Sequence, residues 1–366
     1  MLNTEKFVEG LVEAGYSAIF CVPCSFATEL INAVLEDERI DYFPSACEFS
    51  AVSQCAGYNL AGQKGLVIMQ STGVGNSFST LTSLLQPYGI NIPIISSKRT
   101  WKEGDPEIQH GVLAENLEKT IFTAKFGYQV LDQFSEEEAI SQLDDSYNQP
   151  VITILNKGTF SKYEQKIPTP EDDYIPRIEF LKALNEKYAG RDDIVFCGTT
   201  GATSREMYTY MKDCNNFLQA GNMGGILAVA TGAALANPDK TYIVLDGDSA
   251  SMMHMGSSVN ASNWLASNSI PVNMLHALFD NNLNATTGGQ PSPMEGFNME
   301  AYMMEHYPIA LSGILNPEDL VDAIEEMLED QDTGLRGCVI KCSHTSELPP
   351  RPVVQDLIDS KLAFIK

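Results

Sequence analysis

The sequence predicts an α/β protein made of two doubly wound parallel-sheet domains. Its candidate strands are apolar along their whole length, as in GLVIMQ (65–70) and TYIVL (241–245). These strands alternate with segments whose apolar residues recur at helical spacing. Continuous apolar strands that alternate with helices are typical of a parallel sheet covered by helices on both faces.

One stretch interrupts this alternation. The segment KYEQKIPTPEDDYIP (162–176) contains three prolines and charges of both signs. Such a composition is typical of an exposed connection between domains. We therefore expect a first domain over 1–165, a linker over 166–178 and a second domain over 179–366, and the 366 residues suffice for two full cores.

The apolar spacing and the turn residues predict the elements of the first half in order. Strands are expected over 16–23, 40–46, 65–70, 92–97, 128–131 and 151–156. Helices are expected over 1–16, 27–37, 47–62 and 113–124, together with a glycine-rich turn over 71–77 that opens a helix. A polar loop, KRTWKEGDPEIQHG, fills 98–111.

The second half has the same style. Strands are expected over 193–198, 216–219, 241–248, 272–281 and 335–343. Helices are expected over 178–190, 202–213, 226–236, 250–266, 317–330 and 353–365. We find no repeat of the amino-acid sequence itself, so the repetition predicted here is one of topology.

Composition excludes several classes of partner. The formal net charge is −25, which argues against nucleic acid or an anionic membrane because a phosphate backbone needs a basic surface. No apolar run is long enough to span a bilayer. The first residues, MLNTEKFVEGLVEAGY, indicate an amphipathic helix rather than a signal peptide, and we expect a cytosolic protein.

The eight cysteines include one C-x-x-C pair, Cys21 and Cys24. The pair lies where a strand enters a turn, and no second C-x-x-C or histidine pair stands at zinc spacing. We interpret these cysteines as small buried hydrophobic residues, with a redox or metal role as the alternative.

Polar side chains follow two successive apolar strands of the second half. The run YIVL ends in Asp246 and Asp248, and LHALF ends in Asp280 and Asn281. Ligands bind beyond the carboxyl ends of parallel strands, and oxygen ligands at two adjacent strand ends suit Mg²⁺. The alternative is that Asp248 only caps a helix that begins at 249 or 250.

Groups that could bind an anion surround these acids. Ser249 and the start of the following helix supply a hydroxyl and free N–H groups, and Thr286 and Thr287 precede two glycines. A diphosphate bridged by Mg²⁺ would fit both sets of groups.

This pattern resembles the diphosphate-binding motif of thiamine diphosphate (ThDP) enzymes, and the similarity extends over nearly the whole chain. It is closest to the phosphonopyruvate and sulfopyruvate decarboxylases, which lack a middle domain. The segments that carry it are FCVPCSF, SACEFSAVSQCAGYNLAG, QSTGVGN, SSKRTWKEGDPEIQH, GTTGATSREMY, GNMGG, GDSASMMHMG, DNNLNATTGGQPS and ELPPRP. Two departures stand out: Ser249 replaces a glycine, and 281 − 248 = 33 positions separate Asp248 from Asn281, several more than usual.

The resemblance implies a ThDP-binding fold with a pyrimidine domain over 1–165 and a diphosphate domain over 179–366. It implies that Glu48 bonds the aminopyrimidine ring as the catalytic carboxylate. It implies that Met223 bends the cofactor and that the Gly221 carbonyl accepts a hydrogen bond from the amino group of the cofactor. The Mg²⁺ ligands would be the side chains of Asp248 and Asn281 and the Leu283 carbonyl, and further cofactor contacts would come from Gly247, Ser249, Thr199, Thr200 and Thr286.

The substrate implied is a 2-oxo acid with an anionic tail. Lys98, Arg99 and Lys102, together with His110, concentrate basic side chains in one loop of an otherwise acidic chain, although an ordinary exposed loop is the alternative. Ser25 and Gln290 are further candidates for substrate contact.

The resemblance favours decarboxylation of 3-phosphonopyruvate to phosphonoacetaldehyde and CO₂, a step of phosphonate biosynthesis. The alternatives are a 3-sulfopyruvate decarboxylase, a ThDP-dependent carboligase and, from another class, a non-catalytic Mg²⁺- or nucleotide-binding regulatory subunit. The family arrangement further implies a homodimer or homotetramer with active sites between subunits.

Overall fold

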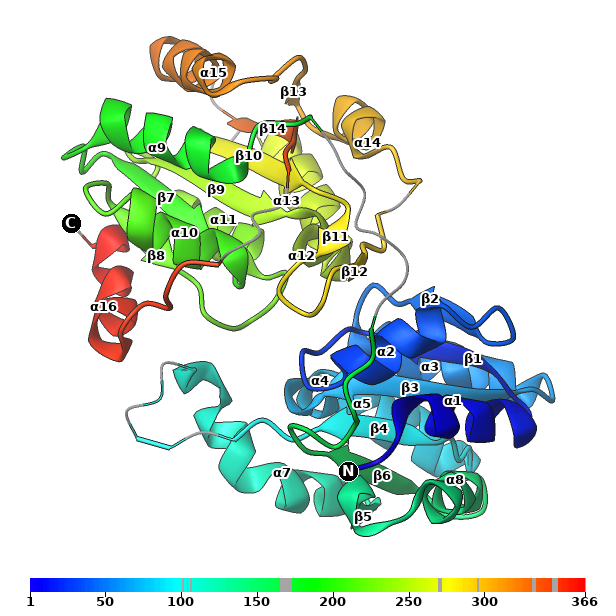
Figure 1. Cartoon of the computed structure of the whole chain (residues 1–366). Helices are drawn as coiled ribbons and strands as arrows, with labels where there is room; N and C mark the ends of the chain where they lie inside the picture. The colour runs from blue at the N-terminus through cyan, green and yellow to red at the C-terminus, as the bar shows by residue number, and fades with distance from the viewer. Residues whose placement is uncertain are drawn as a thin grey trace. The chain divides into compact units, whose positions relative to one another are not determined.

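The computed structural model describes residues 1–100, 102–103, 105, 107–164, 173–268, 272–294, 296–330, 334–343 and 348–365 (Figure 1). The chain forms two compact units. The first comprises Met1–Glu103, Gln109–Pro170 and Thr286–Pro291, and the second comprises Gly104–Ile108, Glu171–Ala285 and Ser292–Lys366. Residues 166–172 of the predicted linker lie outside the described residues, so its bounds stay a prediction.

The first unit contains a six-stranded sheet in the order β2-β1-β3-β4-β6-β5, and its neighbouring strands pair in parallel. Its strands are β1 (Tyr16–Cys21), β2 (Asp41–Pro44), β3 (Lys64–Gln70), β4 (Ile94–Ser97), β5 (Gly127–Val130) and β6 (Val151–Leu155). Cys21 pairs with Pro44 on one side and with Ile68 on the other. The carboxyl ends of these strands therefore meet at one edge.

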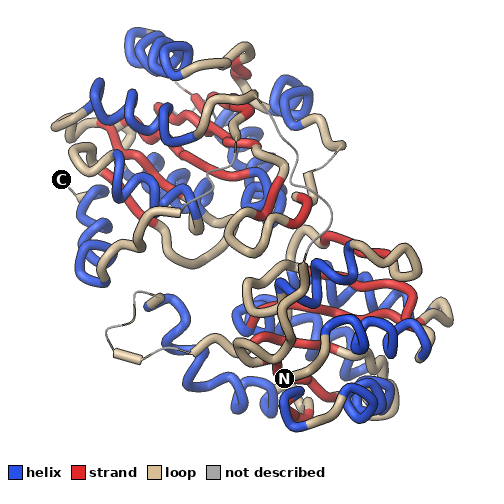
Figure 2. The backbone as a smooth tube through the Cα atoms, in the orientation of Figure 1, coloured by secondary structure: helices blue, strands red, loops and turns tan. Residues whose placement is uncertain are grey.

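Helices cover both faces of this sheet (Figure 2). One core joins the sheet to α1 (Thr4–Glu13), α2 (Thr28–Leu35) and α8 (Glu136–Asp145), and the other joins it to α3 (Glu48–Leu60), α4 (Ser71–Asn76) and α7 (Gly111–Thr123). Short elements complete the unit: α5 (Phe78–Thr80), a π-helix η1 (Leu81–Leu85), α6 (Gln86–Tyr88), and 3₁₀ turns η2 (Ile108–His110) and η3 (Leu131–Gln133).

The second sheet has the order β8-β7-β9-β10-β14-β13, again with parallel pairs. Its strands are β7 (Ile194–Gly198), β8 (Asn216–Leu218), β9 (Thr241–Gly247), β10 (Asn273–Asp280), β13 (Ile309–Leu311) and β14 (Gly334–Lys341). Counted from the start of each unit, both sheets have the strand order 2-1-3-4-6-5. The predicted α/β class with two doubly wound parallel sheets is confirmed, and so is the repeated topology.

The second sheet is also covered on both faces. One core joins it to α9 (Arg177–Tyr188), α10 (Ala202–Tyr210) and α15 (Pro317–Glu329), and the other joins it to α11 (Ile226–Ala236), α13 (Met255–Asn268) and α14 (Met299–His306). The remaining elements are α12 (Asp248–Met253), α16 (Val354–Asp359), a 3₁₀ turn η4 (Ser360–Phe364) and a small sheet of β11 (Leu283–Asn284) with β12 (Gln290–Pro291). Within the described residues, no helix is both long and apolar enough to cross a membrane.

Several elements differ from the sequence prediction, among them the unpredicted α14 and β13. The glycine-rich stretch 71–77 is itself helical, as α4. The helix expected over 250–266 is divided into α12 and α13. Helix α8 was not predicted, because three glutamates in its first turn conceal the apolar spacing; a reciprocal capping box between Ser135 and Glu138 begins this helix.

The cysteines behave as small hydrophobic residues. Cys21 and Cys24 are free and buried, and the Cys24 thiol lies 2.9 Å from Ser97 Oγ. Burial raises the pKa of the Cys21 thiol, which disfavours the thiolate needed for redox or metal chemistry.

A buried ion pair joins α9 to α10 in the second unit. Arg177 Nε donates to Glu206 Oε2 at 2.6 Å, and Arg177 Nη2 donates to Glu206 Oε1 at 3.1 Å. Both side chains are almost fully removed from solvent. Loss of one partner would leave an uncompensated charge in the interior.

We predict that Glu206→Gln lowers the free energy of unfolding by about 3 kcal/mol, because Arg177 then keeps a buried charge without its counterion. Urea denaturation of the cofactor-free protein measures this change. The matched control is Glu179→Gln, which removes the same charge from a half-exposed pair with Lys182 and should leave the midpoint unchanged. Equal effects of the two substitutions would contradict the prediction.

Candidate active site

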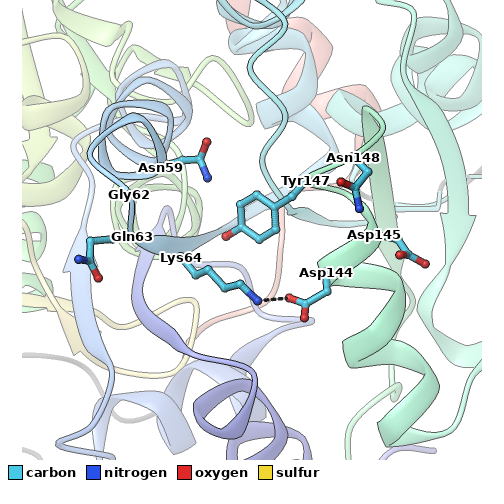
Figure 3. Close-up of a pocket in the computed structure, with 8 residues that line it drawn as sticks. All are labelled: Asn59, Gly62, Gln63, Lys64, Asp144, Asp145, Tyr147 and Asn148. Atoms are coloured by element: carbon cyan, nitrogen blue, oxygen red, sulfur yellow. Dashed lines mark hydrogen bonds and ion pairs between the residues drawn. The ribbon is translucent and has the colours of Figure 1, made fainter.

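A shallow hollow of about 440 Å³ lies at the end of the first sheet where β3 begins (Figure 3). Lys64, the first residue of β3, bonds Asp144 Oδ1 there at 3.0 Å. Its lining residues are Asn59, Gly62, Gln63, Lys64, Asp144, Asp145, Tyr147 and Asn148. None of these lining residues was predicted to belong to the active site. The predicted site residues that directly follow a strand lie instead at the carboxyl edge of their sheet.

In the second unit, four adjacent strands each end at a predicted site residue or segment. Thr199 follows β7, the GNMGG turn (221–225) comes after β8, Asp248 follows β9, and Asn281 follows β10. Phe279 of β10 pairs with Gly247 of β9, so the two strands end side by side. The parallel sheet therefore brings these residues to its carboxyl edge, where ligands of such sheets bind.

Asp248 is a buried carboxylate with one unused oxygen. Its side chain is 5% exposed; Oδ1 accepts a hydrogen bond from the Ser249 amide at 2.5 Å, and Oδ2 has no partner within the described residues. Burial, and secondarily the charge of Asp280, raises the pKa of Asp248 to about 7. A capping side chain would bond an amide two or three positions ahead, and the residue before the helix is Gly247, so the capping alternative does not hold.

The two threonines after β7 differ in their bonds. Thr200 Oγ1 donates to the Ala220 carbonyl at 2.6 Å. Thr199 Oγ1 is buried and has no partner among the described residues. Buried polar atoms are nearly always bonded, so unpartnered oxygens on Thr199 and Asp248 indicate a site built for a further group.

Asn281 and Leu283 form a tight turn after β10. Asn281 Oδ1 accepts from the Leu283 amide at 3.1 Å, and a carbonyl oxygen has a second lone pair for a cation. The neighbouring acid, Asp280, is already bonded to Lys341. No cluster of three or more His, Cys, Asp or Glu side chains suits a metal within the described residues, so amide and backbone oxygens must complete a metal site here.

The GNMGG turn lies directly against α12. Asn222 and Gly224 both have positive φ, and a Cβ on Gly224 would lie 2.6 Å from the Ala250 carbonyl oxygen. Glycine is therefore required where the turn approaches the helix that Asp248 begins. Met223 is half-buried in this turn, next to Gly221.

Ser249 does not leave its hydroxyl free for a ligand. Ser249 Oγ donates to Ser292 Oγ at 3.0 Å, and Ser292 itself is buried. The Ser292 amide bonds the Asn282 carbonyl at 2.9 Å. The side chain that departs from the family pattern thus ties α12 to the segment after β10.

Thr286 and Gln290 belong to the first unit rather than to the unit that holds Asp248. Thr28 Oγ1 donates to the Thr287 carbonyl at 2.7 Å, and Gln290 Nε2 donates to Asn32 Oδ1 at 3.1 Å. Both bonds attach this segment to α2. The predicted contact of Thr286 with a diphosphate stays a prediction.

Glu48 lies at the carboxyl edge of the first sheet. It is 1% exposed and is the first residue of α3, after β2. Asn76 Nδ2, at the end of α4, donates to Glu48 Oε2 at 2.6 Å. A Cβ on Gly73 would lie 2.5 Å from Glu48 Cγ, so the glycine of α4 makes room for this carboxylate.

Two of the predicted substrate residues meet at this edge. Arg99 Nη2 donates to Ser25 Oγ at 2.9 Å, and its guanidinium carbon lies 4.3 Å from the centre of the Phe26 ring. Arg99 Nε is buried without a partner in the described part of the chain. Lys98 instead points to Tyr128, with Nζ 3.4 Å from the phenolic oxygen.

His110 is buried and directly precedes α7. Among the described contacts of the basic loop residues, that of Arg99 with Ser25 joins two predicted substrate residues.

Comparison with known families decides the class of protein. Residues 3–105 match the thiamine pyrophosphate enzyme N-terminal TPP binding domain, and residues 198–335 match the C-terminal TPP binding domain of the same enzymes. The chain belongs to the thiamine pyrophosphate enzymes. Thiamine pyrophosphate is ThDP, so the cofactor implied by the sequence is confirmed.

Individual relatives agree with the family. A phosphonopyruvate decarboxylase of Streptomyces hygroscopicus is 28% identical over 79% of this chain and 75% of its own length. A sulfopyruvate decarboxylase of Methanosarcina acetivorans is 26% identical over 78% of this chain and 77% of its own. The sulfopyruvate decarboxylase subunit alpha of Methanocaldococcus jannaschii is 35% identical over 32% of this chain and 70% of its own.

The donor set of the second unit fits ThDP with a hard cation. A diphosphate carries several negative oxygens, and Mg²⁺ combines a few protein oxygens with phosphate oxygens. The unpartnered Asp248 oxygen suits the cation, and the buried Thr199 hydroxyl can donate to a phosphate oxygen.

Several residues of this ThDP enzyme that contact the candidate site residues were not singled out from the sequence. Gly73 and Asn76 support Glu48, and Ser71 Oγ accepts from the Arg99 amide at 3.4 Å. All three belong to QSTGVGN, which carried the family resemblance without any role for its side chains. Ser292 lies 43 positions from Ser249, and no spacing rule connects the two.

We predict that Asp248→Asn stabilises the cofactor-free protein in a pH-dependent way. The raised pKa means that folding disfavours the ionised carboxyl, so the wild type loses stability as the pH rises from about 4 to about 7 and then levels off. Asparagine carries no charge, and the variant should be more stable by on the order of a few kcal/mol at pH 8 and by little at pH 4. Urea unfolding without Mg²⁺ and ThDP measures this, and a pH-independent difference would contradict it.

Proposed function

We propose that the chain is a Mg²⁺- and ThDP-dependent decarboxylase of a 2-oxo acid with an anionic tail, with 3-phosphonopyruvate as the preferred substrate and phosphonoacetaldehyde and CO₂ as products. The observation that carries the substrate class is the Arg99 guanidinium, which is anchored to Ser25 and retains an unpartnered buried Nε. A relative named for phosphonopyruvate and another named for sulfopyruvate support the same class.

When bound, ThDP would supply the nucleophilic carbon and would accept the electron pair that stays behind when the bond to CO₂ breaks. Glu48 would bond the aminopyrimidine ring and help to move its proton; burial at a helix start and the hydrogen bond from Asn76 hold that carboxylate in place. Met223 would pack against the cofactor and help to bend it, and the Gly221 carbonyl would accept a hydrogen bond from the amino group of the ring.

The diphosphate end of the cofactor is assigned to the carboxyl edge of the second sheet. Asp248, Asn281 and the Leu283 carbonyl would bind Mg²⁺. Contacts to the diphosphate would come from Thr199 and from the backbone of Gly247 and Ser249, with Thr200 and Thr286 as further candidates. We assign the diphosphate contact to Thr199 before Thr200, because the Thr200 hydroxyl already donates a hydrogen bond to the Ala220 carbonyl, whereas the Thr199 hydroxyl has no partner within the described residues.

Arg99 is the residue that we assign to the anionic tail. A guanidinium binds phosphonate or sulfonate oxygens through a fork of N–H donors. Its stacking on Phe26 and its bond to Ser25 fix the direction of that fork. Sulfopyruvate is the second candidate substrate, since both tails are oxyanions of similar shape and five relatives are named for sulfopyruvate.

We further propose that the enzyme works as a homodimer or homotetramer with active sites between subunits. The support is that several relatives are named as alpha or beta subunits of sulfopyruvate decarboxylase.

A parallel assay of phosphonopyruvate, sulfopyruvate and pyruvate with the purified protein tests the substrate class. Turnover of pyruvate alone would refute the anionic tail.

We predict that Glu48→Gln reduces CO₂ release by about 100-fold or more, because the amide cannot exchange a proton with the aminopyrimidine. The variant should still show the rise in melting temperature that ThDP and Mg²⁺ produce. Glu13→Gln, an exposed change of the same kind on α1, is the control and should keep full activity. Undiminished CO₂ release by the Glu48 variant would remove the proposed mechanism.

We predict that Arg99→Met raises KM for the anionic substrate by about 10-fold or more while kcat changes less, because a charge-assisted hydrogen bond to the tail is lost. The neighbouring Lys98→Met removes the same charge from a side chain that contacts Tyr128, and its KM should stay near the wild-type value. Steady-state kinetics of both variants decide the assignment. A larger KM effect at Lys98 would reverse it.

A further inference from the structure

Behind the candidate metal site, three polar side chains form a buried chain of hydrogen bonds. His276 Nδ1 lies 2.7 Å from the Tyr307 phenolic oxygen, and His276 Nε2 lies 3.2 Å from Asp246 Oδ2. Asp246 and His276 are each 1% exposed and Tyr307 is 6% exposed. All three lie in the second unit.

This chain crosses an otherwise apolar face of the sheet. Tyr242 and Val244 precede Asp246 on the same side of β9, and Met274 and Leu278 flank His276 on β10; these four belong to one hydrophobic core. A polar group in such a place costs stability unless its hydrogen bonds are made. Asp246, His276 and Tyr307 all make hydrogen bonds in the structure. A buried polar network whose members are all bonded makes the core around it rigid.

The donors and acceptors follow from the groups themselves. A carboxylate only accepts, so His276 Nε2 carries the hydrogen that it donates to Asp246. In a neutral ring, Nδ1 then accepts from the Tyr307 hydroxyl. The second oxygen, Asp246 Oδ1, accepts from the Gly247 amide at 2.9 Å. These hydrogen bonds therefore end on the amide of Gly247, the residue before Asp248.

Strand β14 leaves space for the ring of Tyr307, the outermost of the three side chains. A Cβ on Gly337 would lie 2.6 Å from the Tyr307 ring, so only glycine fits there. Gly337 pairs with His276 across the sheet, which sets the ring of Tyr307 beside the histidine. The rings of His276 and Tyr307 are 6.0 Å apart at 24°.

We propose that His276 and Tyr307 are positioning residues for the metal-binding carboxylate. Their hydrogen bonds fix the Asp246 carboxylate, which in turn bonds the Gly247 amide. The position of that amide then sets the direction in which the backbone continues from β9 to Asp248. Outer groups that orient metal ligands commonly change metal affinity by 10- to 100-fold when removed. The inference rests on the metal site proposed above.

The test measures the Mg²⁺ concentration that gives half of the ThDP-induced rise in melting temperature, at saturating ThDP, for the full chain. Tyr307→Phe deletes only the hydroxyl and should raise this concentration about 3- to 10-fold. His276→Leu should raise it at least about 10-fold. His276→Gln, whose amide can donate to Asp246, should recover part of the loss.

The matched control is Tyr242→Phe, which deletes a hydroxyl from the same core; no hydrogen bond of that hydroxyl is found in the described residues. It should leave the Mg²⁺ requirement unchanged, whatever it does to the melting temperature without cofactor. The inference is overturned if Tyr307→Phe and His276→Gln keep the wild-type requirement, or if Tyr242→Phe shifts it equally. A wild type that shows no Mg²⁺ dependence would instead refute the metal site itself.

Discussion

The parallel pairing of β9 with β10 is the constraint on which the site of the second unit depends. Because Phe279 pairs with Gly247, the strands end together and Asp248 and Asn281 follow at adjacent positions of one edge. Asp248 is buried at this edge, and one of its carboxylate oxygens has no partner within the described residues. A cation bound there would offset the cost of desolvating the Asp248 carboxylate. Burial of Asp248 therefore destabilises the metal-free protein and favours the metal-bound protein.

The same topology places the other half of the chemistry. Both sheets have the strand order 2-1-3-4-6-5, and in each unit the candidate residues follow the first four strands. In the first unit these ends carry Ser25, Glu48, the α4 segment with Asn76, and Arg99. One fold, used twice, thus presents in one unit the carboxylate that we propose for proton transfer and the guanidinium that we propose for the anionic tail, and in the other unit the carboxylate that we propose to bind the metal.

The sequence was sufficient for the fold class and for residues at strand ends, because apolar runs that stop at a polar residue mark those ends directly. It could not rank Thr199 against Thr200, or Arg99 against Lys98, because the choice depends on which side chain finds a partner elsewhere in the fold. Contacts such as His276 with Tyr307, 31 positions apart, depend on the neighbouring strand β14 and have no local signal.

We propose that the carboxyl edge of the second sheet binds ThDP through a divalent cation. Calorimetric titration of ThDP into the protein, with and without Mg²⁺, measures this binding. We expect saturable binding of one ThDP per chain that requires Mg²⁺ and disappears in Asp248→Asn. Binding that is equally tight without the metal, or that survives this substitution unchanged, would contradict it.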